Sequence, residues 1–282
     1  MWPGNALSWA STGAAVGSGV AGQGVDPDVV RYEVAEGRAT LTIDDPQRRN
    51  PLTTETMAAL AAAVRRAADD ENARVIVITG AGPAFSAGGD LAGGFIESPL
   101  ASHGARGALA DLFRSLRRCA KPTIARVNGP ALGGGFGLAA ACDMVIAAED
   151  AIMGTPEIRV GLWPMIITAV LRPVVPQKAL FEMMATGRRF PAAEGVGLGI
   201  VTRAVPAGEL DGALDEVVAA LLAHSPATLA IGKAAFYATE DMDLDSALDH
   251  LQAGLTAVGA TEDAAEGVAA FVEKRDPEWR GR

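Results

Sequence analysis

Residues 122–147 read PTIARVNGPALGGGFGLAAACDMVIA, and they decide the fold class. A short apolar strand turns at Asn128-Gly129-Pro130, passes three glycines, and continues into a small-residue helix before a second apolar strand. Strands alternating with helices are typical of an α/β protein. Glycine lets the backbone approach a ligand closely, and the first amides of a helix lack intrahelical acceptors. Gly133–Gly135 is therefore either a ligand site or only a tight turn.

A second glycine-rich segment, Ala87-Gly88-Gly89-Asp90, follows the apolar run Val75–Ile78. That run is continuous rather than alternating, which predicts a strand covered on both faces. If the two glycine segments face each other, one amide from each can bind the same oxygen atom, as in an oxyanion hole. Taken singly, this segment also fits an ordinary turn after a strand.

The chain before these segments predicts a hairpin and a helix. Residues 30–34 and 39–43 alternate apolar and polar side chains around Gly37. A helix follows with Thr53 or Thr54 as its N-cap. Its apolar positions have helical spacing; they are Met57, Leu60, Ala61, Val64 and Ala68. After Asp90 the pattern is irregular to about residue 104, a length typical of functional loops, and a helix is predicted over 105–119.

The sequence after residue 206 has helical periodicity only. One apolar stripe contains Leu210, Leu214, Val217, Val218, Leu221 and Leu222, and three further helical stretches follow. Helices after an α/β core often form a lid or an oligomer contact. We expect a flexible Gly/Ala-rich tail over 1–27, an α/β core over 28–205 and a helical region over 206–282. The tail lacks the basic residues of a secretory signal.

Composition limits the classes of partner. The net charge of −10 argues against a nucleic-acid surface, and no apolar run reaches the roughly 18 residues of a membrane helix. Cys119 and Cys142 are too few for a disulfide framework, so we expect two buried thiols and a cytoplasmic location. Charges beyond about 8 Å are screened, so local cations can still hold an anionic ligand. The candidates are Arg48, Arg49 and Lys274.

One pattern points elsewhere. Gly135, Gly137 and Ala140 satisfy the alanine-ending form of the dinucleotide-binding fingerprint, and Glu157 follows at a plausible interval. The match does not directly follow its strand, however, and it lies in the middle of the chain. A nicotinamide cofactor is therefore the weaker interpretation.

Read in order, several segments resemble the signature of the enoyl-CoA hydratase/isomerase (crotonase) superfamily. They are Asn50-Pro51-Leu52, residues 85–91, 127–135 and 141–143, Pro156-Glu157-Ile158-Arg159-Val160-Gly161-Leu162, and the terminal stretch 270–275. The resemblance covers about residue 29 to the end. It implies a spiral of ββα units, followed by helices that make trimers or hexamers or form a lid. It also implies an acyl-CoA substrate, with no cofactor beyond that CoA and no metal.

The resemblance assigns roles to individual positions. Gly89 and Gly134 match the residues whose amides form the family's oxyanion hole. The Ala87 carbonyl matches a contact to the adenine of CoA, and Lys274 matches a basic residue that reaches CoA phosphates from a neighbouring subunit. The full set of implied CoA-binding positions is Ala87, Gly88, Asp90, Leu91, Arg48 and Lys274.

One departure from the family decides the expected reaction. Family hydratases use two glutamates, and here the first position is Gly137, which leaves Glu157 alone. A single carboxylate suits moving a proton from C2 to C4 of a 3-enoyl-CoA, which shifts the double bond. One branch of the family's isomerases resembles this arrangement. The alternatives are a hydratase that uses one glutamate and a catalytically idle acyl-CoA- or partner-binding protein.

Other residues are weaker candidates. Trp163 and Met165 replace a glycine-rich segment of many relatives, so that they, with Gly137, can shape an acyl pocket or simply pack in the core. Ser86 lacks the context of a serine nucleophile. Glu97 and His103 are possible substitutes for the missing carboxylate, and His224 and His250 are expected to be structural.

Overall fold

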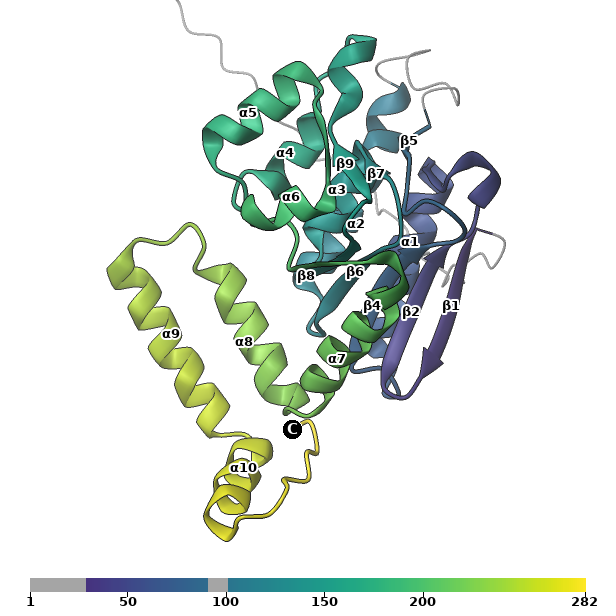
Figure 1. The fold of residues 1–282 in the computed structure, drawn as a ribbon. Helices are drawn as coiled ribbons and strands as arrows, with labels where there is room; N and C mark the ends of the chain where they lie inside the picture. The colour runs from purple at the N-terminus through teal and green to yellow at the C-terminus, as the bar shows by residue number, and fades with distance from the viewer. Residues whose placement is uncertain (1–28, 91–100) are drawn as a thin grey trace, which may run out of the picture.

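The computed structural model describes residues 29–90 and 101–282. The predicted tail over 1–27, together with Leu91 and Glu97, lies outside the described residues. Within them, helices and strands follow one another along the chain in α/β fashion (Figure 1).

A six-stranded sheet forms the centre of the molecule, in the order β1-β2-β4-β6-β8-β11. Its strands are β1 Val30–Ala35, β2 Arg38–Ile43, β4 Val75–Gly80, β6 Thr123–Val127, β8 Met144–Ala148 and β11 Arg203–Val205. β1 and β2 are antiparallel, and all later neighbours are parallel. The predicted hairpin is confirmed; its two-residue turn places Glu36 and Gly37 at positive φ, as such turns require. β4 is buried throughout, which confirms the expected covering of both faces.

Two smaller sheets lie beyond the central one, and they bring the glycine segments together. β3 Pro51–Leu52 pairs with β5 Gly88–Gly89, and β7 Ala131–Leu132 joins β9 Ile152–Gly154 and β10 Arg189–Pro191. Strands of two or three residues have no measurable periodicity, so the sequence pattern did not reveal them.

Helices cover the sheets. Three helices pack behind the central sheet (Figure 1): α1 Thr54–Asp69, α2 Ala101–Arg118 and α3 Gly134–Ala141. Three more come later in the chain: α4 Met165–Leu171, α5 Gln177–Thr186 and α6 Ala192–Gly197. Thr53 is the N-cap of α1, because its hydroxyl accepts a hydrogen bond from Thr56 N. The helix predicted from residue 105 in fact begins at Ala101. The sequence shows no regular pattern up to about residue 104, although a helix tolerates a glycine at a cost of about 1 kcal/mol.

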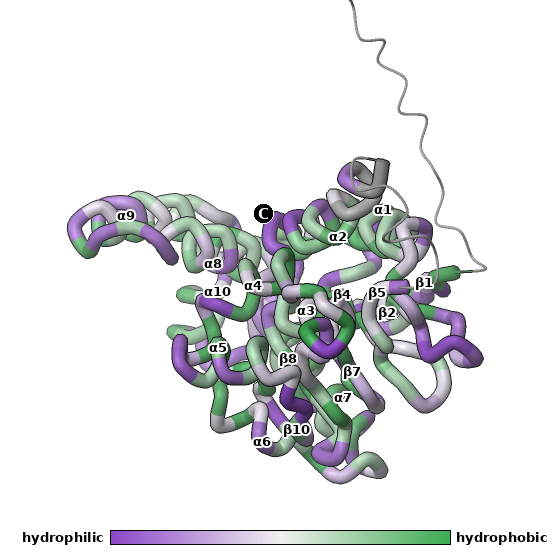
Figure 2. The backbone as a smooth tube through the Cα atoms, turned by 90° about the horizontal axis from the view of Figure 1, so that it is seen from above, coloured by the Kyte–Doolittle hydropathy of each residue, from purple (hydrophilic) through white to green (hydrophobic). Residues whose placement is uncertain are grey.

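The C-terminal part contains only helices and a short tail after Val205. α7 Leu210–Leu222 crosses the front of the central sheet, whereas α8 Pro226–Ala238, α9 Leu244–Gly259 and α10 Glu262–Glu273 project from the core as an arm (Figure 1). In Figure 2, α9 lies far from the sheet. Three 3-10 turns complete the chain: η1 Pro46–Arg48, η2 Pro156–Val160 and η3 Ala207–Glu209. No single helix among the described residues is long and apolar enough to cross a membrane; η3–α7 and α8 satisfy that test only together, across a bend of 102°.

A partly buried charge cluster fastens α8 to the core. Lys233 Nζ lies 2.7 Å from Asp143 Oδ2, and Tyr237 donates to the other oxygen of the same carboxylate at 2.7 Å. Asp143 also accepts hydrogen bonds from the amide and hydroxyl of Thr123 in β6. Because one carboxylate accepts hydrogen bonds from both α8 and β6, this cluster fixes where the arm leaves the core.

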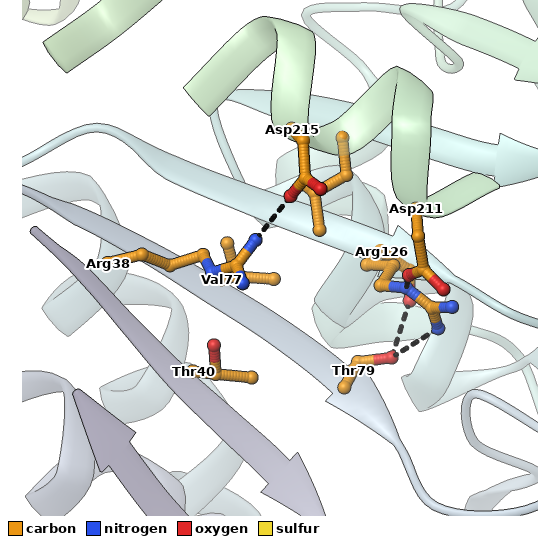
Figure 3. A pocket seen from close by; sticks show the side chains of 8 residues that line it. Arg38, Thr40, Val77, Thr79, Arg126, Asp211 and Asp215 are labelled. Atoms are coloured by element: carbon orange, nitrogen blue, oxygen red, sulfur yellow. Dashed lines mark hydrogen bonds and ion pairs between the residues drawn. The ribbon is translucent and has the colours of Figure 1, made fainter. Parts of the chain in front are cut away.

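α7 is held on the sheet by ion pairs at its edges. Figure 3 shows Arg38 bonded to Asp215, and Arg126 lies 2.8 Å from Asp211. Between these pairs lies a hollow of about 240 Å³. A larger cleft of about 650 Å³ lies where the C-terminal tail meets the ends of α1 and α7. Neither hollow contains a residue of the two glycine segments or Glu157.

Candidate active site

Gly133 is the point where the polypeptide turns into α3. It has a φ of 54° and donates its amide hydrogen to the Gly154 carbonyl at 2.9 Å. A Cβ atom at this position would lie 2.9 Å from Glu157 Oε1. The left-handed backbone and the close carboxylate together require glycine here. The turn therefore brings Glu157 against the start of α3.

The other glycine segment is tied directly to this turn. Ser86 forms a bridge with Ala131, and its carbonyl accepts the Leu132 amide hydrogen at 3.0 Å. Gly88 has a φ of 91°, and a Cβ there would lie 2.5 Å from the Leu132 carbonyl oxygen and 3.3 Å from Gly134 N. The predicted juxtaposition of the two segments is thus present in the fold.

The two candidate oxyanion donors lie next to each other. A Cβ built on Gly134 would be 3.7 Å from Gly89 N. Gly134 is the first residue of α3, so its amide has no acceptor within that helix. Gly89 is exposed, and a Cβ there would meet nothing within 4 Å. A carbonyl oxygen can therefore approach this place from outside, past Leu52 and Leu109, which lie within 3.8 Å of the Gly134 Cβ position.

Glu157 is the titratable group at this place. It lies in the first turn of η2, which begins at Pro156 after the fully buried Thr155. Its Oε2 is buried and has no hydrogen-bond partner among the described residues. Burial raises the pKa of Glu157 above its ordinary 4.5, and a hydrogen bond from its own backbone offsets part of that rise. A carboxylate that holds its proton more strongly is suited to both taking and returning one.

Gly137 lies one turn further along α3, and it is buried. A Cβ there would be 2.3 Å from Ile167 Cγ2 and 3.1 Å from Phe113 Cζ. The space that a side chain at position 137 would need is thus filled by apolar atoms from α4 and α2.

Two buried polar residues, which sequence reasoning did not propose as site residues, hold the Gly88–Gly89 segment in place. Asn50 is fully buried and donates to the carbonyls of Ala81 and Ala84 at 2.9 and 2.7 Å. Ser86 Oγ donates to the Asn50 carbonyl at 2.7 Å and accepts the Gly88 amide hydrogen at 3.2 Å. Ser86 is thus a support of the loop. The signal for Asn50 was its place in the family signature.

The predicted CoA-binding positions are only partly gathered here. Ala87 is exposed beside Gly88, and its amide donates to the Arg49 carbonyl at 2.8 Å. Arg48 forms an ion pair with Asp90 at 2.5 Å, which raises the pKa of the guanidinium. Lys274 is exposed at the end of α10 in the arm, far from β5 and α3 of its own chain (Figure 1).

The remaining candidates are described by their exposure and packing. Trp163 packs on Phe181 with ring centroids 6.0 Å apart, and Met165 is 72% exposed. His103, His224 and His250 are exposed, and Cys119 and Cys142 are buried free thiols. Gly135 also belongs to the dinucleotide-like pattern. A Cβ on Gly135 would meet Ser86 at 2.6–2.8 Å, so this glycine allows close packing rather than ligand approach.

Comparisons with known proteins agree on one family. Residues 33–282 match the family model described as enoyl-CoA hydratase/isomerase. A putative enoyl-CoA hydratase of Thermus thermophilus is 36% identical, with 86% of this chain and 96% of that protein covered. A carnitinyl-CoA dehydratase of Salmonella enteritidis is 37% identical, with 86% and 94% covered. The crystal structure of an enoyl-CoA hydratase from Mycobacterium smegmatis superimposes with a TM-score of 0.86 at 36% identity, covering 89% of this chain and 98% of that one.

Proposed function

This chain belongs to the enoyl-CoA hydratase/isomerase family, has the crotonase fold and is an enzyme of that family; we propose that it moves the double bond of a 3-enoyl-CoA to the 2-position. The observation that supports this most is the lone carboxylate. Glu157 lies against Gly133 with one buried oxygen unpartnered among the described residues, while the first of the family's two glutamate positions is Gly137.

The proposed reaction needs only a proton carrier and an oxyanion hole. The amides of Gly89 and Gly134 bind the thioester oxygen. Glu157 takes a proton from C2; the C–H electrons enter the conjugated system, and negative charge collects on the thioester oxygen. The double bond forms between C2 and C3 when Glu157 returns the proton to C4. Each fixed donor lowers the barrier by about 3 kcal/mol.

A second candidate is supported by the names of the relatives. Hydratase and dehydratase both denote reactions in which water is added or removed. A single Glu157 can serve that chemistry if it both activates water and delivers the proton to C2.

The deciding experiment offers the purified protein 3-enoyl-CoA and trans-2-enoyl-CoA thioesters of several lengths and follows the products by chromatography. We expect conversion of the 3-enoyl to the 2-enoyl isomer without 3-hydroxyacyl-CoA. Efficient formation of 3-hydroxyacyl-CoA would establish the second candidate. Acyl-CoA binding without turnover of either substrate would contradict both.

The pH profile tests the role of the carboxylate. Proton abstraction requires ionised Glu157, so kcat/KM should rise with pH as this group loses its proton. Because burial raises the pKa of Glu157, the midpoint of this acid limb should lie above the ordinary 4.5. Initial rates at limiting and at saturating substrate, measured over the acid pH range, give the midpoint of this limb. A limb at or below 4.5 would mean that another group controls the rate.

We further propose a homotrimer or homohexamer, in which Lys274 reaches the CoA phosphates bound by a neighbouring subunit. The arm supports an assembly, because α9 exposes an apolar stripe at helical spacing: Leu244, Leu248, Leu251 and Leu255. A cytoplasmic location and the absence of any cofactor beyond the substrate's CoA complete the proposal.

Charge on the stripe should dissociate the assembly. Leu248→Asp places a carboxylate in the proposed contact, so light scattering should report monomers where the wild-type chain forms trimers or hexamers. Ala253→Asp adds the same charge on the opposite, exposed side of α9 and should leave the assembly unchanged. A monomeric wild-type chain would contradict the proposal.

A further inference from the structure

The space beside Gly137 is filled, and Ile167 fills most of it. Ile167 is the third residue of α4, is 2% exposed, and places its Cγ2 atom 2.3 Å and its Cβ atom 2.8 Å from where a Cβ on Gly137 would be. The Cζ atom of Phe113 in α2 lies 3.1 Å from the same Cβ position. Real Cβ atoms do not approach other heavy atoms below 3.0 Å, so no side chain fits at position 137 without movement of α4.

Glu157 lies against the residue that precedes α3, and Ile167 lies against a residue one turn further along. The carboxylate lies against Gly133, and Ile167 lies against Gly137, four residues on. The Gly137 amide donates to the Gly133 carbonyl at 3.0 Å, so the two positions are one helical turn apart. The contacts one turn along the chain from the Glu157 carboxylate are therefore apolar.

We propose that Ile167 is a specificity-determining residue that keeps a second polar group, and the water it would hold, away from Glu157. The inference rests on the proposed isomerase function of that carboxylate. A 2-enoyl thioester beside Glu157 then has no positioned water on the α3 side to attack C3. The dienolate formed from the 3-enoyl isomer takes its proton back from Glu157 at C4. On this account positions 137 and 167 act as a pair, and the choice between isomerisation and hydration depends on both.

The geometry dictates which substitution opens the space. Alanine at 167 would keep the Cβ atom that lies 2.8 Å from the Gly137 Cβ position, so only glycine removes both close contacts. Ile167→Gly should therefore accept a side chain at 137, whereas Ile167→Ala should accept it poorly. The alanine variant is the matched control, since both variants remove the bulk of the isoleucine side chain.

A double-mutant cycle that compares Tm values tests the packing independently of catalysis. Overpacking of this kind should lower the Tm of Gly137→Ala by about 2–10 °C. Adding the same change to Ile167→Gly should lower the Tm much less, and adding it to Ile167→Ala should lower it nearly as much as in the wild type. Equal Tm values for wild type and Gly137→Ala would overturn the proposal.

The catalytic part is tested in Gly137→Glu/Ile167→Gly, compared with Ile167→Gly alone. A positioned second carboxylate contributes about 10²-fold or more, so the ratio of 3-hydroxyacyl-CoA to 2-enoyl-CoA product should rise by about that factor. If the double variant folds and the ratio is unchanged, Ile167 does not control the reaction, while isomerisation by the wild type stands. If the wild type does not isomerise, the proposed function fails, although the double-mutant cycle still decides whether Ile167 excludes side chains from position 137.

Discussion

Glu157→Gln is expected to lower kcat for isomerisation by about 10²–10⁴-fold or more, with little change in KM. Glutamine keeps the shape of the side chain against Gly133 but cannot accept the proton from C2. The thioester still meets both amides, so binding persists while turnover is lost. Rates with 3-enoyl-CoA and the affinity for a saturated acyl-CoA measure the two effects separately.

The same substitution should stabilise the protein at neutral pH. Because burial raises the folded-state pKa of Glu157, the folded chain binds its proton more tightly than the unfolded chain does. Stability is therefore lost as pH rises from the unfolded pKa through the folded one, and glutamine avoids this loss. The difference in unfolding free energy should vanish in acid. Glu209→Gln, an exposed glutamate of η3, is the matched control and should change neither property. A Glu157→Gln variant that keeps a tenth of wild-type activity would remove the proposed base from the mechanism.

Gly134→Ala is expected to reduce kcat/KM by about 10²–10³-fold, the loss seen when an oxyanion donor is disabled. Its methyl group would lie 3.7 Å from Gly89 N, in the space where the thioester oxygen must lie to reach both amides. Its other contacts, to Leu52 and Leu109 at 3.4 and 3.8 Å, are ordinary. Stability should therefore hold or rise slightly, because alanine favours a helix by about 1 kcal/mol over glycine.

Two further glycines separate this effect from general disturbance. Gly212→Ala makes the same change in α7, where a Cβ meets nothing within 4 Å, and should preserve activity. Gly88→Ala should instead destabilise the fold, since φ is 91° and the Leu132 carbonyl lies 2.5 Å from the new Cβ. Steady-state kinetics and urea unfolding of all three variants test the assignment. Full activity in Gly134→Ala would mean that the oxyanion hole lies elsewhere.

Local patterns along the chain predicted the regular elements well. The hairpin, the Thr53 cap and the buried run of β4 each depend on neighbours within a few residues, and all are present. The family resemblance placed Glu157 and the two glycine segments in one site, and the fold brings these residues together. Their catalytic roles stay predictions.

Contacts between segments far apart in the sequence could not be predicted in this way. The start of α2 was predicted four residues late, because the stretch up to about residue 104 has no regular pattern. Nothing in the spacing of Gly137 indicates that Ile167, thirty residues later, occupies its place. The same holds for the pairing of Arg48 with Asp90, which turns a supposedly free cation into an ion pair. Side-chain packing across elements has no signature in the local sequence.

The order of strands in the central sheet has a consequence for biosynthesis. β1, β2, β4, β6 and β8 are neighbours in space in the order in which the ribosome makes them, and β11 closes on β8. Each new strand can pair with an edge that already exists, without waiting for distant sequence. The amides of Gly89 and Gly134 enter the growing structure first, and Glu157 emerges after them. In a nascent chain, the two glycines proposed as oxyanion donors thus emerge before the glutamate proposed as the base.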